Sequence, residues 1–155
     1  MKVANSAPGP TTSASVGIVN GYSLTFHKVS KDGSGKCDLE ISKSVADSVY
    51  GIVYEIDLAD EAALDRYEGS GYAKKTVHVS TATGLKYASA YVAITTDQKL
   101  IPYHWYKELV IAGAREHDLP APYIQRIFEI PSQEDPDEGR RLKNEQVLKA
   151  FYGSQ

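Results

Sequence analysis

The order in which two hydrophobic patterns follow each other most constrains what this chain can fold into. Apolar and polar residues first alternate in the manner of half-buried strands, over Tyr22–Lys28, Cys37–Ile41, Val49–Ile56, Lys74–Ser80 and Tyr87–Ile94. The densest segment, Val49–Ile56, is rich in β-branched and aromatic residues and predicts a central strand buried on both faces. A turn at Thr83-Gly84 predicts a hairpin between the last two strands.

Helical periodicity replaces this alternation in the last third of the chain. Apolar residues recur at intervals of three and four over Tyr103–His117, a second helix follows Pro122, and a third spans about Asp137–Phe151. Because strands come first and helices last, the sequence predicts an α+β fold rather than alternating βαβ units. With 155 residues, we expect one domain over residues 16–155. Residues 1–15, rich in Ser, Thr, Ala and Pro, are expected to form a poorly ordered tail.

Composition excludes several classes of function. A net charge of −3 and a pI near 5.8 give no positive field for nucleic acid or anionic lipid. The single cysteine, Cys37, excludes an internal disulfide, and no Cys/His spacing matches a zinc site. No apolar run reaches the length of a membrane span, and the N-terminus lacks the apolar core of a secretory signal. We therefore expect a cytoplasmic protein without a metal.

The segment from Asp57 to Tyr72 carries the main candidate for chemistry. Asp57 is a suitable N-cap and Gly69 a suitable stop for a short helix, which places Glu68 in its last turn. A carboxylate is electrostatically unfavourable at the C-terminal end of a helix, where the carbonyl oxygens gather. Such a carboxylate suits a proton acceptor, although a solvated surface glutamate has the same pattern.

Other motifs favour structural roles. The loop Asp32–Lys36 lacks the glycine and the Ser or Thr that a phosphate-binding loop needs, and we interpret it as a turn between strands. The four histidines are not at metal-ligand spacing. Cys37, on an alternating strand, is interpreted as a small core residue rather than a reactive thiol.

Several segments together resemble the γ-glutamylcyclotransferase family, also called AIG2-like. The strand Val49–Ile56 is similar to the family's central strand, and Leu64–Tyr72 reads L-D-x-x-E-G-x-G-Y, like the family's catalytic block. Tyr106 followed by Gly113–Pro120, which reads G-A-R-E-H-D-L-P, resembles a later helix and its exit. The family's N-terminal Y-G-S-N loop does not occur. The corresponding stretch is Val3–Pro10.

The resemblance implies a small mixed β-barrel with peripheral helices toward the C-terminus. It implies that the chain cyclises a γ-glutamyl amino acid, amine or peptide to 5-oxoproline and releases the amine, without a cofactor. Glu68 would be the general acid and base. Tyr106, Tyr72 and Gly69 would contact the substrate, with a purely structural role for either tyrosine left open. The alternative is a non-catalytic small-molecule-binding or interaction domain, or a truncated form, of the same fold. The leaving group, including whether glutathione is a substrate, stays open, as does the oligomeric state.

Overall fold

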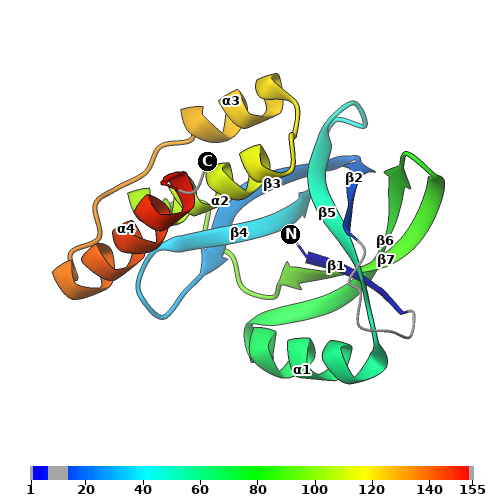
Figure 1. The fold of residues 1–155 in the computed structure, drawn as a ribbon, viewed down its shortest axis with the longest axis horizontal. Coiled ribbons are helices and arrows are strands. Elements are labelled where there is room, and N and C mark those ends of the chain that lie inside the picture. The colour runs from blue at the N-terminus through cyan, green and yellow to red at the C-terminus, as the bar shows by residue number, and fades with distance from the viewer. Residues whose placement is uncertain (1, 7–13, 154–155) are drawn as a thin grey trace.

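The computed structural model describes residues 2–6 and 14–153 of the chain (Figure 1). Its strands are β1 (Lys2–Ser6), β2 (Ala14–Asn20), β3 (Tyr22–Val29), β4 (Gly35–Ile41), β5 (Ser48–Ile56), β6 (Tyr72–Thr81) and β7 (Gly84–Ala93). Its helices are α1 (Leu58–Glu68), α2 (His104–Glu116), α3 (Ala121–Glu129) and α4 (Glu138–Tyr152), with a 3₁₀ turn η1 (Gly69–Gly71) after α1. The α+β prediction is confirmed.

Five strands close into a barrel in the order β1-β5-β2-β6-β7. β1 completes the ring because it pairs in parallel with β5, where Val3 lies opposite Val53, and antiparallel with β7, where Val3 lies opposite Ala90. The remaining pairs are antiparallel, and β6 and β7 form the predicted hairpin. β5 lies between β1 and β2, which agrees with its interpretation as a central strand.

The expected tail is wrong for part of residues 1–15. Lys2–Ser6 form β1 and residues 14–15 begin β2, while residues 1 and 7–13 lie outside the described residues. The pentapeptide Lys2–Ser6 has only one β-branched residue, so its local preference for a strand is weak. Pairing on both sides, with β5 and with β7, supplies the order that the local sequence does not indicate.

β3 and β4 form a separate two-stranded sheet that extends away from the barrel toward α4 (Figure 1). Its register shifts between Thr25 and Lys28, as in a β-bulge. Asp38 fastens this hairpin to the barrel: its carboxylate, only 4% exposed, accepts a hydrogen bond of 2.7 Å from the Ala93 amide at the end of β7. The hairpin is thereby held beside the end of the β6–β7 pair.

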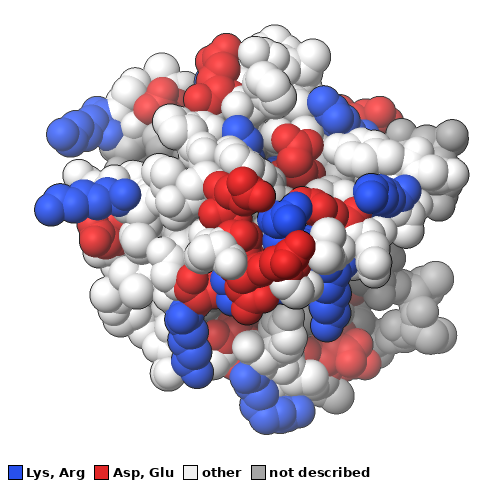
Figure 2. All heavy atoms as spheres, turned by 90° about the vertical axis from the view of Figure 1, so that its left-hand side faces the viewer, with Lys and Arg blue, Asp and Glu red and all other residues white. Residues whose placement is uncertain are grey.

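Three helices gather on one side of the molecule, whereas α1 lies alone against the other end of the barrel (Figure 1). α2 packs against both α3 and α4. The core joins barrel, hairpin and helices through apolar side chains, among them Val19, Phe26, Leu39, Val53, Val79, Ile111 and Ile127. None of the described helices is both long enough and apolar enough to span a membrane. On the face that carries α4, acidic and basic side chains are interspersed (Figure 2).

Asp135 connects the start of α4 to the start of α2. Its side chain is buried and accepts hydrogen bonds of 2.6 Å from Arg140 Nε and Nη2 and of 2.8 Å from the Trp105 indole. The Arg140 guanidinium therefore lowers the pKa of Asp135 from 3.8 to about 2. A carboxylate whose pKa is lower in the folded than in the unfolded chain stabilises the fold above the unfolded pKa.

We expect this stabilisation to be lost as the pH falls from about 4 toward 2. Asp135→Asn removes the charge at every pH, so the gap in unfolding free energy between wild type and variant should narrow by about 2 kcal/mol between pH 5 and pH 2. Urea denaturation at both pH values measures this gap. Glu134→Gln, next to it in an exposed pair with Arg141, should show almost no such change. A gap that stays constant for Asp135→Asn would contradict the assignment.

Candidate functional site

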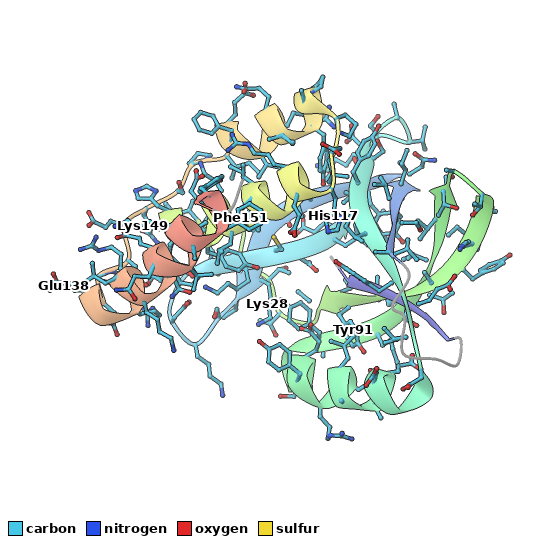
Figure 3. The ribbon with its side chains drawn as sticks, viewed as in Figure 1. Lys28, Tyr91, His117, Glu138, Lys149 and Phe151 are labelled. Atoms are coloured by element: carbon cyan, nitrogen blue, oxygen red, sulfur yellow. The ribbon has the colours of Figure 1, made fainter. Side chains whose placement is uncertain are left out.

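A cavity of about 250 Å³ lies where α1, the barrel, the β3–β4 hairpin and α2 meet. Strand β4 contributes three consecutive wall residues, and α1 contributes its last two. The complete wall comprises Leu24, Cys37, Asp38, Leu39, Val49, Tyr67, Glu68, Tyr72, Tyr91 and Tyr106. Tyr91 and Lys28 lie between the hairpin and α1 in Figure 3. Lys28 is close to the cavity, with its ammonium 4.7 Å from the centre of the Tyr72 ring.

The boundaries of α1 place Glu68 in the wall. The helix begins after Asp57, whose side chain accepts a hydrogen bond of 2.8 Å from the Asp60 amide. It ends at Gly69, which adopts φ +64° and ψ −161° and donates its amide to the Asp65 carbonyl. Glu68 is the last helical residue and is half-buried. Both predicted boundaries are confirmed, and the Glu68 carboxylate lies at the carbonyl end of the helix as expected.

Two tyrosine hydroxyls bond to the backbone of one residue of β4. The Cys37 amide donates to the Tyr106 hydroxyl at 3.2 Å, and the Tyr72 hydroxyl donates to the Cys37 carbonyl at 3.5 Å. Burial raises the pKa of Tyr106 and of Tyr72 above their usual range, and the neighbouring Glu68 charge raises that of Tyr72 further. Both phenols therefore keep their protons. The Tyr72 proton is used at the Cys37 carbonyl, whereas the Tyr106 hydroxyl accepts from the Cys37 amide and can donate its own proton into the cavity.

A polar cluster holds α1 against the barrel beside the cavity. Tyr91, on β7, donates a hydrogen bond to Asp65, which also pairs with the Lys74 ammonium at 2.8 Å. Lys74 reaches Glu61 as well, at 3.1 Å. Burial and the Asp65 carboxylate raise the pKa of Tyr91 to about 12. These contacts join two turns of α1 to β6 and β7 and so fix the direction in which Glu68 points.

Lys36 lies outside the cavity wall and its ammonium contacts the ring of Tyr106. Its ammonium pairs with Asp32 at 2.6 Å and lies 4.6 to 5.6 Å from the ring centres of Tyr106, Trp105 and Tyr103. The side chain is only 14% exposed, so the cation interacts with these rings away from water. The loop that resembled a phosphate-binding loop thus uses its lysine within the fold, in agreement with its interpretation as a turn.

The structure brings together three of the four predicted site residues. Glu68, Tyr72 and Tyr106 come from three separate elements and line the same cavity. Gly69 is not part of the wall, and its place is that of the residue that ends α1. Burial raises the pKa of the Cys37 thiol, as expected of a core residue rather than a reactive thiol.

Sequence reasoning did not assign the other wall residues to the site, among them Asp38, Leu39, Tyr67 and Tyr91. Asp38 and Tyr91 occupy strands whose alternating pattern marks a face but not a cavity, so only the tertiary structure identifies them. Tyr67 precedes Glu68 and is 84% exposed. A large exposed aromatic residue beside a candidate base is a signal that could have been noticed. The described residues contain no group of three or more His, Cys, Asp or Glu side chains that could hold a metal.

The AIG2-like family matches residues 48–127, slightly more than half of the chain. The matched segment runs from β5 through α1, β6, β7 and α2 into α3. It therefore includes Glu68, Tyr72, Tyr91 and Tyr106, but not the wall residues of β4.

Two mammalian proteins named gamma-glutamylcyclotransferase are similar in sequence. The protein from Bos taurus is 31% identical over 93 residues, which are 58% of this chain and 50% of that protein. The protein from Mus musculus is 30% identical over 97 residues, 61% of this chain and 52% of that protein. The alignments thus span about half the length of these relatives.

Solved structures show the same fold at lower identity. One named gamma-glutamyl cyclotransferase superimposes with a TM-score of 0.76 at 22% identity, covering 91% of this chain and 87% of the other. An uncharacterized protein from Homo sapiens superimposes with a TM-score of 0.73 at 24% identity, covering 88% and 86%. At these identities the similarity concerns the fold.

The backbone at Gly69 predicts a measurable cost of substitution. A Cβ at Gly69 would meet no atom within 4 Å, so Gly69→Ala should destabilise the fold only through its positive φ, by about 1–2 kcal/mol. Gly113 also has open space around a Cβ but lies inside α2, and Gly113→Ala should stabilise by about 0.5–1 kcal/mol. Urea denaturation of both variants measures these free energies. Equal effects would show that the Gly69 backbone is not strained for alanine.

Proposed function

The chain belongs to the AIG2-like family, and from this premise we propose that it closes a γ-glutamyl group to 5-oxoproline and releases the amine. One observation carries the proposal: Glu68, Tyr72 and Tyr106, which come from separate elements, line a single cavity. Gamma-glutamylcyclotransferases related to this chain at about 30% identity support it. Because the alignments span half of those proteins, the activity of this chain is our proposal.

The proposed reaction is intramolecular. The substrate's α-amino nitrogen attacks its own γ-carbonyl carbon, a C–N bond forms, and the C–N bond to the leaving amine breaks. Glu68 takes a proton from the ammonium group and returns it to the departing nitrogen. The ring nitrogen loses its second proton after the attack and the departing amine takes up one more to leave as an ammonium, so that no net proton is gained or lost. Holding the chain in a ring-closing conformation can supply about 7–11 kcal/mol of the barrier. The positioned carboxylate adds about 10²- to 10⁴-fold in rate.

The charges of the cavity wall agree with this chemistry. Glu68 and Asp38 are the residues of the described wall that carry a formal charge at neutral pH. Two carboxylates attract the α-ammonium group of a γ-glutamyl substrate and bring it to the base. Asp38 already accepts the Ala93 amide, which leaves Glu68 as the carboxylate available for proton transfer.

Tyr106 is proposed to bind an oxygen atom of the substrate. Burial raises the pKa of its phenol, and because the hydroxyl accepts from the Cys37 amide its own proton is free. A phenol that donates to the γ-carbonyl oxygen stabilises the charge that develops there. The exposed Tyr67 ring at the cavity is placed to contact the leaving group. Amino acids, amines and peptides such as glutathione all remain candidates for that group.

The purified chain should therefore release 5-oxoproline from γ-glutamyl-alanine. Glu68→Gln should lower kcat about 10²- to 10⁴-fold because it removes the proton acceptor with little change in shape. The matched control is Glu129→Gln, the same change at the last residue of another helix, α3, where the side chain is exposed and outside the cavity wall. Its activity should stay close to that of the wild type. Chromatographic measurement of 5-oxoproline follows both variants.

Two outcomes would contradict the proposal. Full activity in Glu68→Gln would remove Glu68 from the mechanism. The absence of 5-oxoproline from wild-type protein that circular dichroism shows to be folded would favour a non-catalytic binding domain. The sequence at Val3–Pro10, which lacks the family's Y-G-S-N motif, is the observation that keeps this second function in view.

A further inference from the structure

One edge of β4 faces away from its partner strand. In an antiparallel pair, residues alternately direct their N–H and C=O groups toward and away from the partner. The Ser42 amide bonds to the Gly21 carbonyl at the start of β3, whereas the Gly35 amide bonds to Ile101 and the Cys37 amide to Tyr106. Even-numbered residues of β4 therefore face β3, and Cys37 and Leu39 face away from it.

At Cys37 this outer edge is already occupied. The Tyr106 hydroxyl accepts from the Cys37 N–H, and the Tyr72 hydroxyl donates to its C=O. The two phenols thus take the places that the C=O and N–H groups of a neighbouring strand would have. No further strand or ligand can therefore pair with the backbone of Cys37. Cys37, Tyr72 and Tyr106 all line the cavity.

Leu39 is the next residue on the same edge. It is 3% exposed and lines the same cavity, about 7 Å along the strand from Cys37. Among the described residues, no group forms a hydrogen bond with its outward N–H or C=O. Backbone groups that are buried without a partner cost free energy, and nearly all such groups in native proteins are paired. Both groups of Leu39 are therefore available to a ligand in the cavity.

We propose that the Leu39 N–H and C=O bind the α-amino acid end of the substrate as one strand residue binds another. The N–H donates to the α-carboxylate and the C=O accepts from the α-ammonium. A free α-amino acid carries both groups on one carbon, as a residue of a paired strand does. The identity of the ligand rests on the proposed function, whereas the open edge of β4 does not.

The charges of the site favour this assignment. The described cavity wall contains no lysine or arginine, and the nearby Lys28 ammonium lies over the Tyr72 ring and donates to the Val29 carbonyl. With the Tyr106 hydroxyl assigned to the γ-carbonyl oxygen, a neutral backbone N–H is a donor that remains for the α-carboxylate. The ammonium at the Leu39 carbonyl lies in the same cavity as Glu68, its proposed proton acceptor. Peptides with an α-linked glutamyl group lack the free α-carboxylate and should not bind.

Amide hydrogen exchange measured by NMR tests this binding without changing Leu39. The ¹⁵N-labelled Glu68→Gln variant is saturated with γ-glutamyl-alanine, which it should bind but not convert. Exchange of the Leu39 amide should slow at least 10-fold. The Ile41 amide, on the same edge but 77% exposed and outside the cavity wall, is the internal control and should not change. The same ligand with its α-carboxyl converted to an amide should bind at least 10-fold more weakly and protect Leu39 less.

The outcomes separate this inference from the proposed function. Chemical-shift changes at Tyr72 and Tyr106 without protection of Leu39 would overturn the inference and leave the proposed function standing. Protection of Leu39 in a chain whose wild type makes no 5-oxoproline would support the inference and overturn the proposed function. A ligand that changes no amide at millimolar concentration would overturn the inference, and wild-type activity would then decide the function.

Discussion

The backbone of β4 is the point at which the separate parts of the structure are joined. Its Cys37 peptide groups bond to Tyr72 at the start of β6 and to Tyr106 in α2, and the adjacent Asp38 carboxylate bonds to the end of β7. These bonds satisfy polar groups that would otherwise be buried without partners. They also set the width of the cavity, because the hairpin, the barrel and α2 each contribute one side of it. The cavity therefore depends on the hydrogen bonds that hold β4 against β6, β7 and α2.

Much of the fold could be predicted because its signals are local. The alternation in β3 to β7, the cap at Asp57 and the stop at Gly69 depend on neighbouring residues, and the structure has them where the sequence predicts them. β1 and β2 could not be predicted in the same way. The order of β1 comes from its partners, β5 and β7, which are distant in sequence. In β2 the alternating pattern of side chains is interrupted at Gly17, where the missing side chain leaves room for Val79 and Val53.

The residues of the candidate site likewise fall into those with a local sequence signal and those without one. Glu68, Tyr72 and Tyr106 were found through motifs that resemble a known family, and the structure places them around one cavity. Asp38 and Leu39 carry no motif. Their importance comes from the direction of a side chain and of a backbone edge, which depends on the register between β3 and β4. A one-residue change in that register would exchange the edges, and no local pattern in the sequence specifies it uniquely.

The closure of the barrel by β1 also bears on how the chain folds as it is made. β1 leaves the ribosome before both of its partner strands, because Val3 pairs with Val53 and with Ala90. Neither neighbour exists until 50 and then 87 further residues have been added. Pairings of such large sequence separation form slowly, because a long loop must close before any contact compensates for the entropy lost. The barrel therefore closes late. Until then β5 has an unpaired edge that could pair with other nascent chains.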